Sequence, residues 1–222
     1  MFGFEMCRRK SDKVESLRDG VGTDAIFHSY MLQYKRLLCN SILARVVHKG
    51  FETSYHFTLN LECVIFVPDQ LKTEFFKAKK ALLDAQKVVI ISHRGPDGDA
   101  VGSNVALRMA LEAQGKTVVS ADVDPIPENS MFLAKADTFV HDFNYEEFDV
   151  IVSVDCGDLK LVKFPETKPE MLTGGKPFIN FDHHDSNNLY GTINPVEKGA
   201  AATATVLYKF MKFCEWPVTI DI

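Results

Sequence analysis

Three short segments of the chain concentrate carboxylate and imidazole side chains. They are His93-Arg-Gly-Pro-Asp97-Gly-Asp99, Asp155-Cys-Gly-Asp158 and Asp182-His183-His184. If these side chains lay together, their negative charges would repel one another, and bound divalent cations would remove that repulsion. A mixed set of carboxylates and imidazoles suits manganese, iron, cobalt or zinc better than calcium. Two such ions can activate a bridging water and hold a phosphoryl group, so the residue types predict metal-assisted hydrolysis of a P–O bond.

Each segment alone has an ordinary structural explanation. Pro-Asp-Gly-Asp is a frequent turn sequence. A His-His pair is more often a packing or surface feature, and Asp-Cys-Gly-Asp could be a polar strand end. Their order along the chain, each after an apolar run, favours one shared site over three unrelated features.

The apolar runs before the three segments are typical of buried parallel strands. The predicted strands are Lys87–Ser92, Thr117–Ala121, Asp149–Val154 and Lys176–Phe181. Helical periodicity is found at Leu71–Gln86, Ala100–Gln114 and Ala200–Cys214. Strands that alternate with helices predict an α/β fold, in which a mostly parallel sheet is flanked by helices on both faces. Since ligands bind beyond the carboxyl ends of such strands, the three segments should meet at one rim of the sheet.

The rest of the chain gives weaker signals. We expect a short helix around Ser130–Ala134 and a strand at Thr138–Val140. Residues 1–68 include a mixed stretch that could form an amphipathic helix and two strand-like runs, at Phe27–Val47, Tyr55–Leu59 and Cys63–Val67. No catalytic spacing occurs there. We interpret residues 1–68 as an unassigned N-terminal extension or a wrongly assigned start.

Composition narrows the class of partner. The chain has 222 residues, a net charge of −5 and 46% hydrophobic residues. An acidic chain argues against a protein that coats long duplex DNA, which would need a basic surface. Its five cysteines form no C-x-x-C pair, so we expect reduced thiols and a cytoplasmic location. Neither a secretory leader nor a membrane span is expected.

Two residues near the first segment are candidates for binding substrate. Ser103 lies near the start of a predicted helix, where free backbone N–H groups attract anions, although an ordinary early-helix role is equally consistent with its position. Arg94 is a candidate phosphate contact, and a solvated loop residue is the alternative.

The segments also resemble a known family. His93-x-x-Pro-Asp97-Gly-Asp99-Ala-x-Gly-Ser103, then Asp155, then Asp182-His183-His184-x-Ser186-Asn187 are similar to the motifs of the DHH phosphoesterase superfamily. The P-D-G-D-A-x-G-S form resembles the branch of nano-RNases, which are oligoribonucleases that also remove the 3′-phosphate of phosphoadenosine phosphate, and of cyclic dinucleotide phosphodiesterases. It is less similar to the family II pyrophosphatases, whose first motif usually reads P-D-T-D-S.

The resemblance implies two manganese ions and a role for each motif residue. His93 and Asp97 would hold the first ion, Asp99 and His183 the second, and Asp155 would bridge both. Asp182 would orient the ligands from behind. His184 would face the substrate phosphate or the nucleophilic water. The implied substrate is a short oligonucleotide or a small phosphorylated nucleotide, and a homodimer is left open.

The sequence departs from the family pattern in two ways. A fourth motif with a further metal-binding Asp, and a second domain with a glycine-rich substrate-binding motif, are both missing. We therefore expect residues 69–222 to be a truncated DHH phosphoesterase domain with a weakly held second metal. Two alternatives remain: a catalytically incomplete metal- or nucleotide-binding fragment, and a pyrophosphatase or polyphosphatase.

Overall fold

The structure, a computed structural model, describes residues 41–48, 51–58, 67–219 and 222. The chain divides into two units, Met1–Val64 and Ile65–Ile222, which we describe separately. In the first unit, β1 (Ser41–His48) pairs antiparallel with β2 (Phe51–Thr58). The helix predicted at Phe27–Val47 is wrong where it overlaps β1, because that stretch pairs with β2 as a strand. Residues 27–40 and 63–66 lie outside the described residues.

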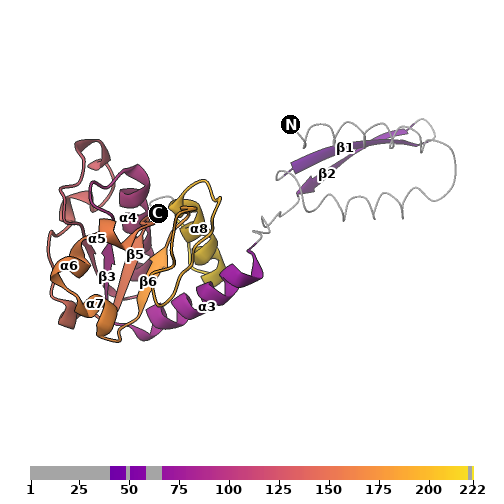
Figure 1. The fold of residues 1–222 in the computed structure, drawn as a ribbon. Helices are drawn as coiled ribbons and strands as arrows, with labels where there is room; N and C mark the ends of the chain where they lie inside the picture. Colours follow the sequence, from indigo (N-terminus) through magenta and orange to yellow (C-terminus); the bar gives the residue numbers. More distant parts are fainter. Residues whose placement is uncertain (1–40, 49–50, 59–66, 220–221) are drawn as a thin grey trace. The chain divides into compact units, whose positions relative to one another are not determined.

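The second unit is built on a sheet of four parallel strands (Figure 1). Its order is β4-β3-β5-β6, with the bounds β3 Lys87–Ile91, β4 Thr117–Ala121, β5 Val150–Val154 and β6 Phe178–Phe181. Every residue of β5 and β6 is buried, as expected for parallel strands covered on both faces. The predicted α/β class and all four predicted strands are confirmed.

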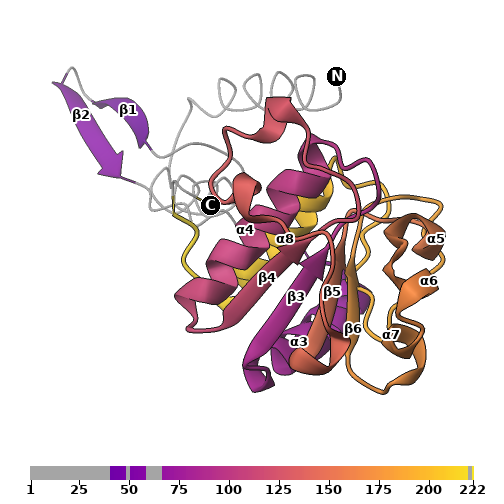
Figure 2. The same cartoon turned by 90° about the vertical axis from the view of Figure 1, so that its left-hand side faces the viewer.

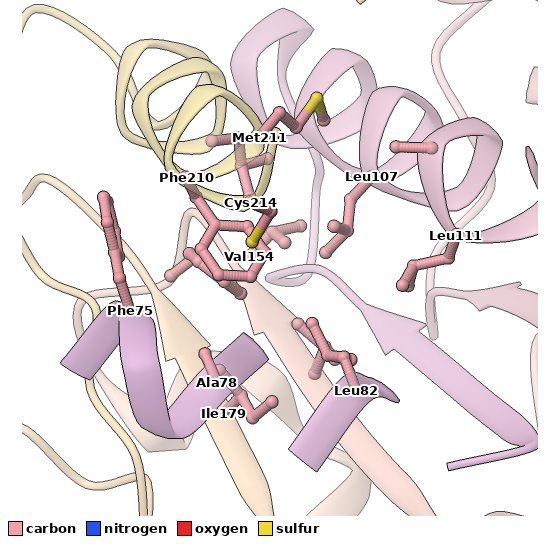
Figure 3. Packing of buried hydrophobic residues seen from close by; sticks show 14 of the residues in the cluster. Phe75, Ala78, Leu82, Leu107, Leu111, Val154, Ile179, Phe210, Met211 and Cys214 are labelled. Carbon is pink, nitrogen blue, oxygen red and sulfur yellow. The ribbon is translucent and has the colours of Figure 1, made fainter. Parts of the chain in front are cut away.

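Three long helices cover one face of the sheet. They are α3 (Asp69–Asp84), α4 (Gly98–Ala113) and α8 (Thr203–Cys214). Figure 3 shows their apolar side chains converging over the strands. Phe210 of α8 is the centre of this core, because its ring lies 5.3 Å from that of Phe75 and 4.9 Å from that of Phe181. The core joins α8 to both α3 and the sheet.

Short elements cover the opposite face (Figure 2). They are α5 (Leu159–Val162), α6 (Phe164–Thr167), α7 (Glu170–Thr173) and the 3-10 turn η3 (Tyr145–Glu147). Large side chains from these elements and their flanks, among them Phe143, Tyr145 and Phe164, fill a second core against Val89 and Ile151. Helices therefore flank both faces, as predicted.

Two further 3-10 turns, η1 (Glu128–Ser130) and η2 (Ala136–Thr138), lie in a segment that packs against α4, where Ile126 and Ala136 are buried with Val101 and Val105. Two predictions for this segment are corrected. At Ser130–Ala134 the chain forms the 3-10 turn η1 and further turns instead of a helix. At Thr138–Val140 there is no strand. Thr138 ends η2, and only Val140 makes an isolated parallel bridge, with Ala121. Such short segments offer too few residues for a periodic pattern to distinguish the alternatives.

The strand order creates a switch point between β3 and β5. From β3 the chain moves outward to β4 on one side, and then returns to form β5 on the other side. In parallel sheets, the crevice at the carboxyl end of such a switch point is the usual ligand site. No helix among the described residues is long and apolar enough to cross a membrane.

We predict that Phe210→Ala lowers the free energy of unfolding by about 3–5 kcal/mol, because it leaves a cavity between α3, α8 and the sheet. Phe76→Ala is the control, since Phe76 on α3 is 69% exposed and should cost far less. Urea unfolding of both variants measures the difference. Equal costs would contradict the central position that we assign to Phe210.

Candidate metal centre

The three segments that concentrate carboxylate and imidazole side chains follow the carboxyl ends of neighbouring strands. Ile91, the last residue of β3, pairs with Ser153 of β5, and Val154 pairs with Phe181 at the end of β6. The residues after these ends therefore emerge on the same rim. The rim includes the switch point between β3 and β5. The predicted convergence of His93, Asp155 and Asp182 on one edge of the sheet follows from this register.

A first group of possible metal ligands lies at the switch point. One ligand atom each from His93, Asp97 and Asp155 lies within 4.8 Å of the other two. His93 Nδ1 is 2.9 Å from the carbonyl oxygen of Arg94, so Nδ1 carries the hydrogen and Nε2 keeps a free lone pair. Asp97 caps α4 by accepting hydrogen bonds from Asp99 N and Ala100 N through Oδ1, which leaves Oδ2 available.

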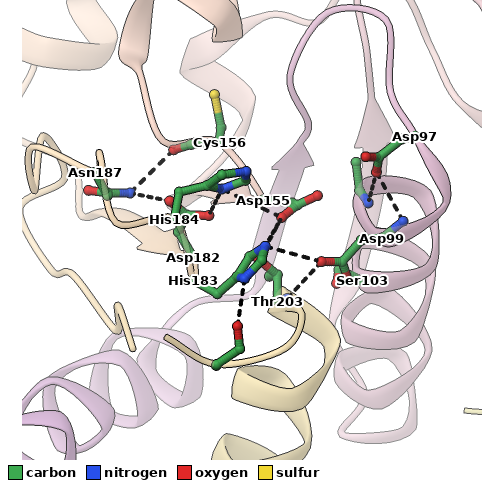
Figure 4. A network of polar contacts seen from close by, with 12 residues as sticks. Asp97, Asp99, Ser103, Asp155, Cys156, Asp182, His183, His184, Asn187 and Thr203 are labelled. Carbon is green, nitrogen blue, oxygen red and sulfur yellow. Dashed lines mark hydrogen bonds and ion pairs between the residues drawn. The ribbon is translucent and has the colours of Figure 1, made fainter. Parts of the chain in front are cut away.

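A second group shares Asp155 with the first. Ligand atoms of Asp155, His183 and His184 also lie within 4.8 Å of one another. His183 Nδ1 donates to the carbonyl oxygen of Ala200 at 2.9 Å, so its Nε2 is again the free nitrogen. That Nε2 is 3.6 Å from Asp155 Oδ1 and 3.7 Å from Asp99 Oδ2. Figure 4 shows Asp155 between the two histidines and the start of α4.

Asp99 is near this second group but is already engaged. Its Oδ2 accepts from Thr203 N at 2.7 Å, and its Oδ1 accepts from Ala204 N at 3.1 Å and from Ser103 Oγ at 3.2 Å. Thr203 and Ala204 are the first two residues of α8, and the N-cap residue of this helix, Ala202, offers no side-chain acceptor. Asp99 thus caps α8 from a different helix. A carboxylate at a helix N-terminus is stabilising.

Asp155 is the most constrained residue of the site. Its side chain is 2% exposed, and its backbone is left-handed with φ 57°, a conformation that Asp adopts more readily than most residues. Thr203 Oγ1 donates to its Oδ1 at 2.7 Å. Burial, followed by the charges of Asp99 and Asp97, raises the pKa of Asp155 to about 6. A bound cation would relieve this cost directly.

Asp182 and its partners hold the His-His pair from behind. Asp182 is fully buried, accepts from His184 Nδ1 at 2.7 Å and from Asn187 Nδ2 at 2.5 Å. The hydrogen bond to Asp182 is the largest cause of a raised pKa at His184. The bond fixes the His184 ring and leaves its Nε2 without a partner among the described residues.

The donor set fits divalent transition metals with nitrogen and oxygen ligands. The free atoms are imidazole nitrogens and carboxylate oxygens, the set preferred by manganese, iron, cobalt and zinc. A thiolate does not take part: Cys156 is buried, its Sγ donates to the carbonyl oxygen of Asp158, and burial raises its pKa to about 12. The shared position of Asp155 fits a residue that contacts two ions.

The two substrate-binding candidates lie in different surroundings. Arg94 is 56% exposed in its side chain, and its Nε is 3.8 Å from Asp124 Oδ2, so it remains accessible to a ligand. Ser103 is fully buried and its hydroxyl donates to Asp99. Ser103 therefore lies behind Asp99, with its hydroxyl bonded to that carboxylate.

Sequence reasoning missed two contributors to the site. Thr203 donates to both Asp155 and Asp99, across more than forty residues of chain, and no local pattern marks it. Gly157 is buried against the His-His segment: a Cβ there would lie 3.0 Å from His184 Cβ and 3.3 Å from Ser186 Oγ. The glycine in the Asp-Cys-Gly-Asp segment was the available signal for this close approach.

Comparison with known proteins identifies the family of this chain. Residues 87–221 match the model of the DHH family, N-terminal domain, which is more than half of the chain. The chain belongs to the DHH family. The resemblance noted from the motifs is thereby confirmed, and the matched residues contain all four strands of the sheet and the whole rim described above.

Individual relatives of this DHH domain are longer proteins. The chain is 31% identical over 138 residues to the bifunctional oligoribonuclease and PAP phosphatase NrnA of Thermus thermophilus, with 60% of this chain and 39% of NrnA covered. The crystal structure of an exopolyphosphatase-related protein from Bacteroides fragilis has a TM-score of 0.57 at 23% identity, with 64% of this chain and 43% of that chain covered. The DHH chain spans about two fifths of the length of these relatives. The structural match supports the fold.

We predict that the metal-free protein becomes less stable as pH rises from 5 to 7. A group whose pKa is raised by folding adds stability below its unfolded pKa, and this is lost as pH passes the folded pKa. For Asp155, with its pKa raised to about 6, the loss should be about 1 kcal/mol over this range. Asp155→Asn keeps an acceptor for Thr203 and should remove the part of the pH dependence of stability that comes from Asp155. Urea unfolding in EDTA measures it. Asp122, with a pKa raised to about 7 by burial, leaves a residual slope in both proteins, and an unchanged slope in Asp155→Asn would count against our account.

We also predict that Gly157→Ala moves His184 away from Asp182, because the new methyl group would lie 3.0 Å from the His184 Cβ, closer than ordinary van der Waals contact. The raised pKa of His184 should then fall toward its ordinary value, since the hydrogen bond to Asp182 is its largest cause. NMR titration of the metal-free protein reports this pKa. Gly102→Ala is the control, because a Cβ there meets nothing within 4 Å; an equal effect of both changes would refute the contact.

Proposed function

We propose that this protein is a manganese-dependent phosphoesterase that hydrolyses short oligoribonucleotides or small phosphorylated nucleotides with a water activated by two metal ions. One observation carries the proposal: Asp155 belongs to two donor groups at once, with His93 and Asp97 on one side and with His183 and His184 on the other. A carboxylate shared in this way is the arrangement needed to hold two ions close together.

The residues present can each take a defined part in this reaction. His93 and Asp97 would hold the first ion, His183 and Asp99 the second, and Asp155 both. When bound, the two ions would acidify a water molecule to hydroxide near neutral pH and neutralise the phosphoryl oxygens. The protein's task is then to fix the donor atoms, and the hydrogen bonds of Thr203 and of the Ala200 carbonyl do so for Asp155 and His183.

His184 could act as a proton donor through its Nε2. Its Nδ1 donates to Asp182, and this bond raises the pKa of the ring. A larger fraction of His184 is therefore protonated near neutral pH than of an ordinary histidine. The proton on Nε2 could be donated to a phosphoryl or leaving oxygen. We assign Asp182 as the group that orients His184 for this role.

Substrate class is inferred from charge and from the relative NrnA. A net charge of −5 disfavours long nucleic acids, whereas a small phosphate ester needs only the ions and a few contacts such as Arg94. The similarity to an oligoribonuclease and PAP phosphatase supports nucleotide substrates. We further propose that residues 69–222 form the catalytic DHH domain and that Ser103 stabilises Asp99 without contacting substrate.

A second candidate is a metal-binding domain without turnover. The position of Asp99 favours it, because this carboxylate accepts three hydrogen bonds and lies outside both compact ligand groups. A second ion would have to compete with α8 for the same oxygens. In that case the His93, Asp97 and Asp155 group would bind one ion tightly and hydrolysis would be absent.

The test is hydrolysis of a labelled pentaribonucleotide in Mn²⁺, with mononucleotide release as the readout. Asp97→Asn and Asp155→Asn should each reduce the rate by more than about 100-fold, since even residues that only support metal ligands contribute 10–100-fold. The control is Asp149→Asn: Asp149 accepts from Gln86 N and Lys87 N at the opposite end of β3 and should leave the rate unchanged.

The outcomes separate the two candidates. Mononucleotides from the wild type, lost in both site variants, support the phosphoesterase. One tightly bound Mn²⁺ per chain with no product from oligonucleotides, phosphoadenosine phosphate or pyrophosphate supports the binding domain. Release of phosphate from pyrophosphate alone would replace the nucleotide substrate with a pyrophosphatase activity. Equal rates in wild type and Asp155→Asn would rule out the two-metal site.

A further inference from the structure

A carboxylate from outside the DHH motifs contacts the loop of the first metal group. Asp124 lies on the turn that follows β4. Its Oδ2 accepts a hydrogen bond from Gly95 N at 2.8 Å and lies 3.8 Å from Arg94 Nε. One oxygen atom thus meets both the backbone and the side chain of the segment between His93 and Asp97.

The contact with Gly95 controls the shape of this loop. Gly95 has a positive φ of 60° and lies midway between the two predicted ligands. On one side the loop is tied to α5, because Arg94 N donates to the carbonyl oxygen of Leu161 at 2.8 Å. On the other side Asp124 holds Gly95 N. The separation of His93 and Asp97 therefore depends on Asp124 as well as on the loop itself.

Asp124 is itself held on a rigid base. Its backbone N donates to Asp122 Oδ1 at 2.9 Å, and Asp122 is fully buried at the end of β4. Asp122 N donates to the carbonyl oxygen of Val140, and His141 Nδ1 donates to the carbonyl oxygen of Asp122, both at 3.0 Å. A carboxylate fixed from below can orient a flexible partner above it.

That flexible partner is Arg94. Only its Nε faces Asp124, and its two terminal nitrogens have no partner among the described residues. A guanidinium held at Nε can still offer its other N–H groups as a fork to a phosphate. Without Asp124, the half-exposed side chain would lose the contact that limits its rotation, and each phosphate contact would cost more conformational entropy.

We propose that Asp124 is a positioning residue that aims Arg94 at the substrate phosphate and holds the His93–Asp97 loop in its metal-binding shape. The first part rests on the proposed function, because it requires a phosphate at the rim. The second part requires only a metal ion. Each part can therefore be tested without turnover.

The first test is calorimetric titration of the Mn²⁺-saturated chain with AMP. Arg94→Ala should weaken AMP binding about tenfold, the loss of one charge-assisted contact. Asp124→Asn keeps an oxygen for Gly95 but removes the negative charge that faces Arg94, and should weaken AMP binding about threefold. The double variant should bind AMP as Arg94→Ala does, because Asp124 acts through Arg94. A full additional threefold loss in the double variant, or no loss in Asp124→Asn, would overturn this part.

The second test is Mn²⁺ binding followed by electron paramagnetic resonance, without nucleotide. Asp124→Ala should weaken the first Mn²⁺ about tenfold, and Asp124→Asn should restore it, because the amide oxygen replaces the acceptor for Gly95. Asp149→Ala is the matched control and should bind Mn²⁺ as the wild type does. Wild-type affinity in Asp124→Ala, or an equal loss in Asp124→Asn, would overturn the loop part. If these patterns hold but no ester is hydrolysed, the proposed function fails and the positioning role stands.

Discussion

The structure depends on the crowding of carboxylates at the carboxyl rim of a parallel sheet. Asp155 is almost completely buried, and this burial, followed by the charges of the nearby Asp99 and Asp97, raises its pKa to about 6. The parallel register causes this crowding, because the segments that carry the carboxylates and imidazoles follow the neighbouring strands β3, β5 and β6 at the same edge of the sheet. The fold tolerates it by giving each carboxylate its own donors: the first turn of α4 for Asp97, the first turn of α8 for Asp99, and Thr203 for Asp155. Helix N-termini and hydroxyls thus hold the carboxylates in place, and bound cations would neutralise the charge that remains.

The sequence was sufficient for the strands and the rim because these follow from local patterns. Lys87–Ile91 is a β-branched run with four buried residues, and its hydrophobicity identifies it without any tertiary information. The short covering elements were not predictable in this way. The helix α5 has only four residues, and of the strand predicted at Thr138–Val140 only Val140 bridges to the sheet. In both cases packing against the second core, rather than periodicity, determines the backbone.

Contacts between distant residues explain what the motifs left open at the site. The motif pattern assigns Asp99 to a metal ion, but the hydrogen bond from Thr203 N to Asp99 spans 104 positions of the chain. The N-cap residue Ala202 has no side-chain acceptor, but the sequence does not show which distant residue caps α8 in its place. Likewise, the place of Ser103 near a helix start predicts a phosphate contact, whereas its burial and its bond to Asp99 favour the supporting role that we propose. Local sequence patterns identify the candidate ligand residues, whereas contacts between distant residues determine which of their atoms are already engaged in hydrogen bonds.

The two donor groups are consequently unequal in their connection to the fold. The first group takes two members from one five-residue loop, with its free atoms already separated from those used for capping. The members of the second group follow β5 and β6, and Asp99, a further carboxylate close to His183, caps α8. An ion that binds Asp99 would therefore weaken the hydrogen bonds that Asp99 accepts from the first turn of α8. Because Thr203 in that turn also donates to Asp155, the same movement would reach the carboxylate that both groups share. The position of α8 is thus coupled to the second group far more than to the first.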